Sequence, residues 1–237
     1  MSLQNFDALD GALLVDKPAG MTSHDVVDEV RRYFNIKKVG HCGTLDPNAT
    51  GLLILVLGKA TKLSERLMSD DKVYEGTAKF GETTDSYDVD GELTASLPVP
   101  PMTLDILNQE ADTFVGDILQ TPPMASAIKK DGVPLYKLAR KGVEVERKPR
   151  LIHIYTYRFL TYEEPLATFR VACTKGTYVR SLVHDLGQKI GCGAHLTTLR
   201  RTVSGKFDVA DAMHLDKLLV LKPAEFAARV IPFLKLT

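Results

Sequence analysis

The sequence predicts an α+β fold, with a mixed but mostly antiparallel sheet flanked by helices. Apolar runs of strand length occur along the whole chain, and helical segments lie between them without a regular strand–helix–strand alternation. Parallel sheets with crossover helices need that alternation, so its absence favours antiparallel pairing with helices packed on the sheet. The chain has 237 residues, of which 44% are apolar, and this is enough for a large buried core.

Strands are expected where a short apolar run is bounded by turn residues. The run Leu52–Leu57 contains only Leu, Ile and Val, which predicts a strand buried on both faces. The other expected strands cover residues 11–16, 73–80, 151–160, 166–174 and 197–203, and a short apolar piece follows at 230–236.

Helices are expected where apolar residues recur at helical spacing behind a capping residue. Apolar residues between Val26 and Phe34 follow Thr22 and Ser23 in this way, which predicts a helix ending near Phe34. The other expected helices cover residues 61–68, 103–114, 135–141, 176–190 and 209–220.

The most unusual stretch is residues 40–51, GHCGTLDPNATG. Its glycines tolerate positive φ angles, and Pro47 disfavours helical dihedrals at Asp46. We therefore expect Asp46 on a stiff loop that leads into a buried strand, where a carboxylate can be a nucleophile or a general base. No serine or second acid lies within four residues of it. An ordinary turn, in which Asp46 bonds its own backbone, is the alternative that these residues leave open.

Composition excludes several classes of protein. No apolar run approaches the roughly 18–20 residues of a membrane span, and residues 1–10 carry no Lys or Arg, unlike a secretory signal. The three cysteines form no CxxC pair, which fits a reducing, cytoplasmic location and argues against disulfide or metal sites.

Charge is balanced overall but segregated along the chain. Residues 69–112 contain eleven acids and two lysines, whereas residues 129–150 contain eight Lys or Arg and three acids. The basic segment lies within a loop-rich insertion expected at residues 117–150. It is suited to phosphate groups, although a solvated basic face is the ordinary interpretation.

Several ordered blocks resemble the TruB-type tRNA pseudouridine synthases, over roughly residues 10–212. They are GALLVDKPAGMTSHDVV, GHCGTLDPNATGLLILVLGKATKL, KVYEG, TDSYDVDG, QTPPMASAIKKDGVPLYKLARKG, GTYVRSLVHDLG and HLTTLRRTVSGKF. The resemblance implies the pseudouridine synthase catalytic fold and isomerisation of the T-loop uridine at position 55 of tRNA. It also implies a catalytic domain at 10–212, whose 117–150 insertion is a basic, thumb-like, RNA-binding element.

The resemblance also implies roles for individual residues. The catalytic group would be Asp46, with Tyr74 as the active-site tyrosine and Arg180 as the arginine that pairs with the aspartate. His41 would help to flip the target base, and Lys17 would support the site from the first motif. The remaining implied substrate or RNA contacts are Tyr178, Lys129, Lys130, Arg140, Lys141 and Arg200.

These residues also have ordinary structural interpretations. A lone tyrosine in a strand, such as Tyr74, is by default a core aromatic, and a lone histidine such as His41 is by default a satisfied polar residue. Arg180 could be a surface arginine of its helix. The sequence alone does not choose between these interpretations and the roles above.

Two features depart from the family pattern. Ala125 stands where the family usually has an aromatic residue. Residues 213–237 form only a short tail, too short for the PUA-type RNA-binding module that bacterial members often add.

The implied reaction conserves hydrogen, so we expect no cofactor and no metal. The expected partner is the T arm of tRNA, with no membrane and no obligatory protein partner, and the protein is expected to be a monomer. Three alternatives stay open: an RNA-guided relative of the archaeal and eukaryotic kind, a non-catalytic RNA binder, and a glycoside hydrolase. The last needs a second acid that pairs with Asp46, and none is evident.

Overall fold

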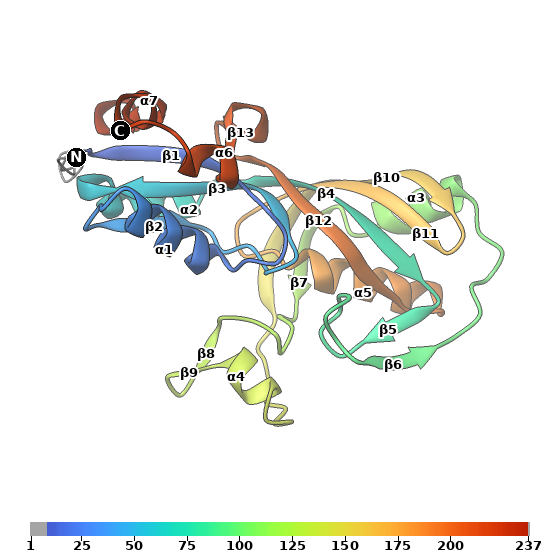
Figure 1. The fold of residues 1–237 in the computed structure, drawn as a ribbon. Helices are drawn as coiled ribbons and strands as arrows, with labels where there is room; N and C mark the ends of the chain where they lie inside the picture. The colour runs from blue at the N-terminus through green and yellow to red at the C-terminus, as the bar shows by residue number, and fades with distance from the viewer. Residues whose placement is uncertain (1–8, 237) are drawn as a thin grey trace. The chain divides into compact units, whose positions relative to one another are not determined.

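A computed structural model describes residues 9–236, which form two compact units (Figure 1). Unit 1 comprises the described residues up to Tyr74 and from Leu199 onward, and unit 2 comprises Glu75–Thr198.

The sheet of unit 1 has the strand order β14-β1-β3-β12. Its strands are β1 (Gly11–Lys17), β2 (Val39–Cys42), β3 (Thr50–Leu57), the end of β12 (Ala194–Ser204), β13 (Phe207–Asp208), β14 (Met213–His214) and β15 (Ile231–Pro232). Strand β3 pairs antiparallel with β1 and β2, and it pairs in parallel with β12 where Arg201 lies opposite Gly51.

Strand β3 is buried on both faces, as its continuous apolar run predicts. Leu53, Leu55 and Leu57 face one core cluster, while the alternate residues, such as Leu52 and Ile54, face another. Both sides of this strand are therefore fixed by packing, and β3 is a rigid support for the loop before it.

The helices of unit 1 cover both clusters. They are α1 (Ser23–Tyr33), α2 (Ser64–Met68), α6 (Leu215–Leu219) and α7 (Pro223–Arg229), with short 3₁₀ turns η2 (Gly58–Leu63), η3 (Val209–Asp211) and η4 (Phe233–Lys235). Helix α1 begins with a capping box, in which Thr22 and Asp25 each bond the backbone of the other. The Phe226 ring of α7 stacks on Phe34 with a centroid distance of 3.7 Å.

Unit 2 contains a sheet in the order β4-β11-β10-β7. The strands of this sheet are β4 (Lys72–Phe80), whose residues up to Tyr74 belong to unit 1, β7 (Gly116–Gln120), β10 (Arg150–Glu163) and β11 (Leu166–Cys173). Two separate two-stranded sheets are formed by β5 (Glu82–Thr84) with β6 (Leu93–Ser96) and by β8 (Lys129–Lys130) with β9 (Val133–Pro134). The helices of unit 2 are α3 (Leu104–Asp112), α4 (Leu135–Ala139) and α5 (Val179–Ile190). Strand β10 pairs antiparallel with both β11 and β7.

Large aromatic side chains fill the core of unit 2. The rings of Tyr157, Phe159 and Phe169 lie 5.2–5.7 Å apart and are about 1% exposed. Asn108 of α3 bonds both the N–H and the carbonyl of Phe159, beside a register shift in β10. This side chain replaces backbone partners that a regular strand would supply.

The α+β class and the mostly antiparallel sheet were predicted correctly, and each expected strand at residues 11–203 is present within two or three residues of its bounds. The predicted helix at 209–220 is wrong. Residues 209–211 form a single 3₁₀ turn, Met213 and His214 pair in parallel with β1, and a helix begins only at Leu215. Pairing with β1 satisfies the backbone hydrogen bonds of Met213 and His214. The helical periodicity of the sequence contains no information about such a partner strand.

The sequence did not predict helix α7 or several short strands, which are β2, β5, β6, β8, β9 and β13. Strand β7 occupies residues 116–120, so the irregular part of the expected insertion is residues 121–149, called the basic insertion below. None of the helices between residues 9 and 236 is long and apolar enough to cross a membrane.

Candidate active site

Asp46 lies in unit 1, on the loop that joins β2 to β3. Its side chain is half-buried, and its neighbour Leu45 is buried. The backbone closes the turn, because the Ala49 N–H donates to the Asp46 carbonyl at 3.1 Å. This backbone bond is compatible with the ordinary Asx-turn considered above, so that alternative stays open.

The residue before Asp46 is fixed by Ser23 at the start of α1. The Leu45 N–H donates to Ser23 Oγ at 2.8 Å, and Ser23 Oγ lies 3.2 Å from the Leu45 carbonyl. Ser23 is buried, so these bonds are shielded from water. The first turn of α1 thus holds the loop on one side of Asp46.

The residue after Asp46 is fixed by Lys17 at the end of β1. Lys17 is completely buried, and its ammonium donates to the carbonyls of Pro18, Met21 and Pro47 at 2.9, 2.6 and 2.9 Å. Burial lowers the pKa of Lys17 to about 8, while the nearby Asp46 carboxylate raises it. An ammonium has three donors, and here all of them bond backbone, so Lys17 supports the loop.

A buried arginine, Arg201, holds the two ends of the loop together. Arg201 is 1% exposed, and its guanidinium donates to the carbonyls of Leu52 at 2.7 Å and Gly43 at 3.0 Å. Gly51 has φ +98°, and a Cβ there would lie 2.3 Å from the Arg201 carbonyl oxygen. Glycine is therefore required at position 51 for β12 to approach this closely.

His41 lies on β2, five residues before Asp46, and is half-buried. Burial lowers the pKa of its imidazole, and the cationic groups of His24 and Arg201 lower it further. Its Nδ1 is buried without a hydrogen-bond partner within the described residues. At neutral pH the ring is therefore uncharged.

Tyr74 is near the start of β4 and is half-buried. Part of its ring packs against the core cluster that contains Leu53 and Leu55. It therefore has some of the core-aromatic character expected of a strand tyrosine, but it is not fully enclosed.

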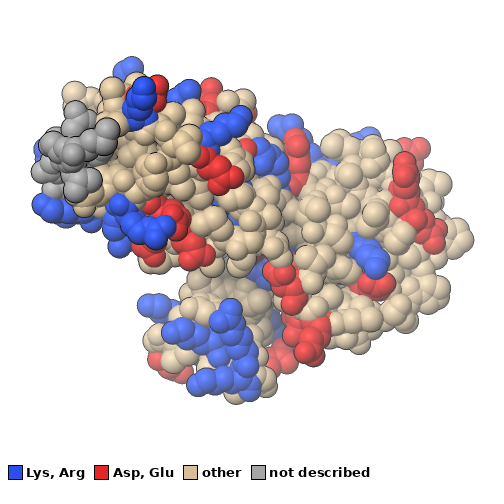
Figure 2. Space-filling model, in the orientation of Figure 1, with Lys and Arg blue, Asp and Glu red and all other residues tan. Residues whose placement is uncertain are grey.

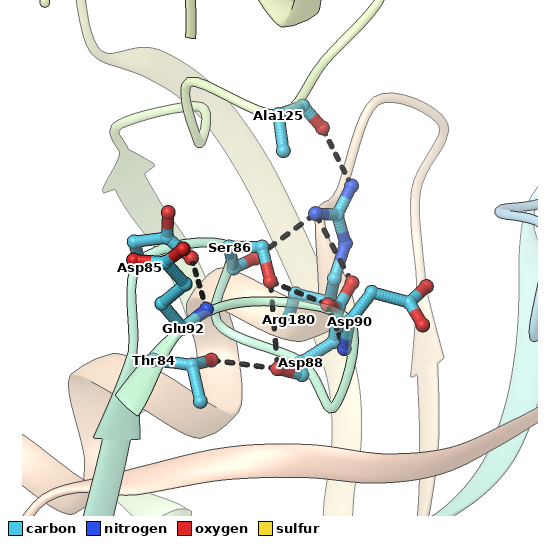
Figure 3. Close-up of polar contacts among 8 residues, drawn as sticks. All are labelled: Thr84, Asp85, Ser86, Asp88, Asp90, Glu92, Ala125 and Arg180. Atoms are coloured by element: carbon cyan, nitrogen blue, oxygen red, sulfur yellow. Dashed lines mark hydrogen bonds and ion pairs between the residues drawn. The ribbon is translucent and has the colours of Figure 1, made fainter. Parts of the chain in front are cut away.

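Arg180 lies in unit 2, in the first turn of α5, and is 4% exposed. Its guanidinium donates to the carbonyls of Ser86 at 3.0 Å and Ala125 at 2.8 Å, and it pairs with the Asp88 carboxylate at 3.4 Å (Figure 3). The surface-arginine interpretation is therefore wrong. Because Ala125 contributes its backbone, this contact does not depend on the aromatic side chain that the family usually has there.

The acidic loop around Asp88 is itself ordered by hydrogen bonds. Asp88 Oδ1 accepts from Ser86 Oγ at 2.5 Å and from the Asp90 N–H at 3.1 Å, and Thr84 Oγ1 donates to the Asp88 carbonyl at 2.7 Å (Figure 3). The Asp88 carboxylate is thus fixed where it meets Arg180. Asp46 and Arg180 belong to different units, so the ion pair that the resemblance implies between them stays a prediction.

The predicted RNA contacts fall into two groups. Exposed side chains gather on the basic insertion, where Figure 2 shows a cluster of Lys and Arg over α4, β8 and β9. Its members from the prediction are Lys129, Lys130, Arg140 and Lys141. Tyr178, at the N-terminal end of α5, is half-buried.

Arg200 is engaged within unit 1. Its guanidinium makes a bidentate pair with the Asp16 carboxylate, at 2.9 and 2.8 Å, and is 40% exposed. A guanidinium already paired in this way offers less positive charge to a phosphate than the insertion lysines do.

Four supporting residues were missed as such: Ser23, Arg201, Asp88 and Gln120. All but Asp88 bond the backbone of a residue more than 20 positions away. All four lie inside the motif blocks quoted above, and membership of those blocks was the sequence signal that marked their positions. Within residues 9–236, no group of three His, Cys, Asp or Glu side chains is placed to hold a metal ion.

Comparison with known proteins identifies the family. Residues 31–179 match the TruB family pseudouridylate synthase N-terminal domain, and residues 180–227 match the tRNA pseudouridylate synthase B C-terminal domain. The chain is 57% identical over 224 residues to tRNA pseudouridine synthase B of Opitutus terrae, covering 94% of this chain and 93% of that protein. It is 50% identical to the protein of the same name from Syntrophotalea carbinolica, covering 92% of this chain and 71% of that one.

Among solved structures, the chain resembles one in a crystal structure of a Cbf5-Nop10-Gar1 complex, with a TM-score of 0.76 and 30% identity. The match covers 95% of this chain and 61% of that one, so the present chain spans about three fifths of its length. The ordered motif blocks predicted this relationship correctly. The chain belongs to the TruB family of pseudouridylate synthases.

Proposed function

We propose that the protein isomerises the uridine at position 55, in the T loop of tRNA, to pseudouridine. Relatives that cover nearly all of this chain are named tRNA pseudouridine synthase B, which supports tRNA as the substrate. The observation that carries the proposal is the loop around Asp46, because Ser23, Lys17 and Arg201 fix its backbone on both sides.

The reaction breaks the N1–C1′ glycosidic bond of uridine, rotates the uracil and forms a C5–C1′ bond. The C5 proton is then lost and N1 gains a proton, so the product is an isomer of the substrate. Asp46 acts in its ionised form. It either attacks C1′ or removes a proton from C2′ to give a glycal, and both routes need the same rigidly placed carboxylate.

Arg180 and Tyr74 complete the proposed catalytic group. A guanidinium within about 4–6 Å of Asp46 would keep the carboxylate ionised and orient it. The half-buried Tyr74 ring would provide a flat face for the uracil, and its hydroxyl would exchange a proton at C5 or C2′.

His41 and the basic insertion would act on the RNA outside the reacting atoms. Extruding a stacked base costs a few kcal/mol and leaves a gap in the stack, which a neutral imidazole ring can fill. The insertion lysines would bind phosphates of the T arm, which positions the RNA without reading its sequence.

The tRNA substrate is favoured over an RNA-guided reaction. Curated relatives with this substrate in their name are 47–57% identical to the chain, whereas the Cbf5 chain is 30% identical. We propose that the enzyme works in the cytoplasm as a monomer, without a cofactor and without an obligatory protein partner. Family membership argues against both a glycoside hydrolase and a non-catalytic RNA binder.

The test is to incubate the protein with an unmodified tRNA transcript and to map pseudouridine at every uridine. The proposal predicts product at position 55 alone, without guide RNA or added protein. A transcript with cytidine at position 55 is the matched control and should give no product. Product elsewhere in the control, or product only after a guide RNA is added, would contradict the proposed substrate.

A further inference from the structure

Gln120 is the last residue of β7, where the chain enters the basic insertion, and it is 3% exposed. Its side-chain amide makes a double hydrogen bond to the backbone of one residue, Tyr178. Gln120 Nε2 donates to the Tyr178 carbonyl at 3.0 Å, and Gln120 Oε1 accepts from the Tyr178 N–H at 2.8 Å. The amide thus serves Tyr178 as the peptide of a neighbouring strand would.

This double bond acts at the start of α5. Tyr178 is the N-cap residue of that helix, it has an extended backbone with φ −97° and ψ 104°, and its own side chain makes no capping bond. Two bonds to one residue fix both its position and its orientation. Arg180 follows two residues later, so the direction in which its side chain leaves the helix depends on the backbone that Gln120 holds.

The residues after Gln120 make two more contacts with the same helical turn. Ser181 Oγ donates to the Thr121 carbonyl at 3.3 Å, and the Arg180 guanidinium donates to the Ala125 carbonyl at 2.8 Å. Residues 120–125 are called the root of the insertion. They therefore contact three groups at the start of α5, which are the Tyr178 backbone, the Ser181 hydroxyl and the Arg180 guanidinium.

We propose that Gln120 is a positioning residue for Arg180, through which the root of the basic insertion sets the orientation of the guanidinium. This inference rests on the catalytic role proposed for Arg180. Gln120 does not touch the RNA in this account. Its loss would lower the rate of isomerisation and leave tRNA affinity unchanged, because small displacements of a catalytic group cost up to about 100-fold in rate.

The experiment measures single-turnover rate, tRNA dissociation constant and thermal unfolding for Gln120→Met, which keeps the length of the side chain and removes both hydrogen bonds. We expect a rate reduced about 10- to 100-fold, a dissociation constant within about twofold, and a protein still folded at the assay temperature. Gln188→Met, on an exposed position of the same helix, is the matched control and should keep the wild-type rate. A wild-type rate for Gln120→Met overturns the proposal.

A double-mutant cycle with Arg180→Lys separates positioning from a general structural role. If Gln120 acts through Arg180, adding Gln120→Met to Arg180→Lys slows the reaction no further, whereas independent roles would multiply and overturn the proposal. A full rate for Arg180→Lys would instead refute the role proposed for Arg180 itself. Should Gln120→Met not fold, Gln120→Glu, which keeps the acceptor and loses the donor, takes its place in the same cycle with the same expected outcomes.

Discussion

At the scale of single residues, the side chains around Asp46 act mainly on backbone carbonyls. Lys17 and Arg201 are charged, yet every hydrogen bond described for them above ends on a main-chain oxygen. Buried charges of this kind are costly unless every donor is satisfied. They indicate that the loop must have one conformation, which is what a reacting carboxylate needs.

The sequence could predict that Asp46 lies on a stiff loop, because Gly43, Pro47 and Gly51 act locally. It could not predict the bonds from Ser23 and Arg201, because their partners are distant in the chain and only the folded sheet brings them together. The resemblance supplied residue roles that composition and spacing do not contain.

His184 provides a prediction about pH. Its ring stacks on Tyr87 with a centroid distance of 3.8 Å, its Nδ1 is buried without a partner in the described part of the chain, and burial lowers its pKa. The unfolded chain therefore binds a proton near pH 6.5 that the native chain binds only at lower pH, so stability falls as the pH falls below about 6.5.

We predict that His184→Phe, which keeps the stacked ring and removes the titrating group, loses less stability than the wild type between pH 7.5 and 5.5. The measurement is the free energy of unfolding in urea at each pH, and the wild type should lose more of it at each step down in pH. Equal losses in the two proteins would show that this imidazole is not protonated on unfolding.

At the scale of secondary-structure elements, long periodic segments were predictable and most short ones were not, although the five-residue helix α4 lies within the helix expected at 135–141. Helix α1 and strand β3 carry strong patterns over many residues, and their bounds were close to those expected. Helix α7, strand β14 and the turn η3 have seven residues or fewer. Their conformation is decided by tertiary partners, such as the pairing of Met213 with Val15.

The basic insertion is the element whose charge should determine tRNA affinity. We predict that replacing Lys129, Lys130, Arg140 and Lys141 by alanine weakens tRNA binding and reduces the slope of log affinity against log salt by about 3. The single-turnover rate at saturating tRNA should stay within about twofold, because these side chains are exposed and outside the proposed catalytic group.

Binding titrations at a series of salt concentrations make this measurement. Lys217→Ala combined with Lys235→Ala, at exposed positions of unit 1, is the control and should leave the slope unchanged. If the fourfold variant keeps the wild-type slope, its four cations do not contact phosphates.

At the scale of the whole molecule, the segment after residue 212 is part of the core of unit 1. Strands β14 and β15 both pair with β1, and Leu215, Leu218, Phe226 and Val230 belong to the same cluster as α1 and β3. From the sequence, residues 213–237 were expected to be a short tail that contains the end of a helix at 209–220 and an apolar piece at 230–236. Its apolar residues gave no sign that they would pack against a helix from the other end of the chain.

We predict that Phe226→Ala lowers the free energy of unfolding by about 3–5 kcal/mol, because it removes a fully buried ring that stacks on Phe34. Urea denaturation measures this value. Leu234→Ala, at a residue that is 84% exposed, is the comparison and should change stability by less than about 0.5 kcal/mol. A small effect at Phe226 would mean that the segment contributes little to the core.

The most direct test of the account is the single-turnover formation of pseudouridine at position 55 by Asp46→Asn, measured beside the wild type with tRNA affinity as the control. The side chain keeps its shape and loses its charge, so binding should change by less than about twofold. We expect a rate reduced by at least about 1,000-fold. Pseudouridine formed at the wild-type rate would contradict it, because the rigid loop would then hold a carboxylate that the reaction does not use.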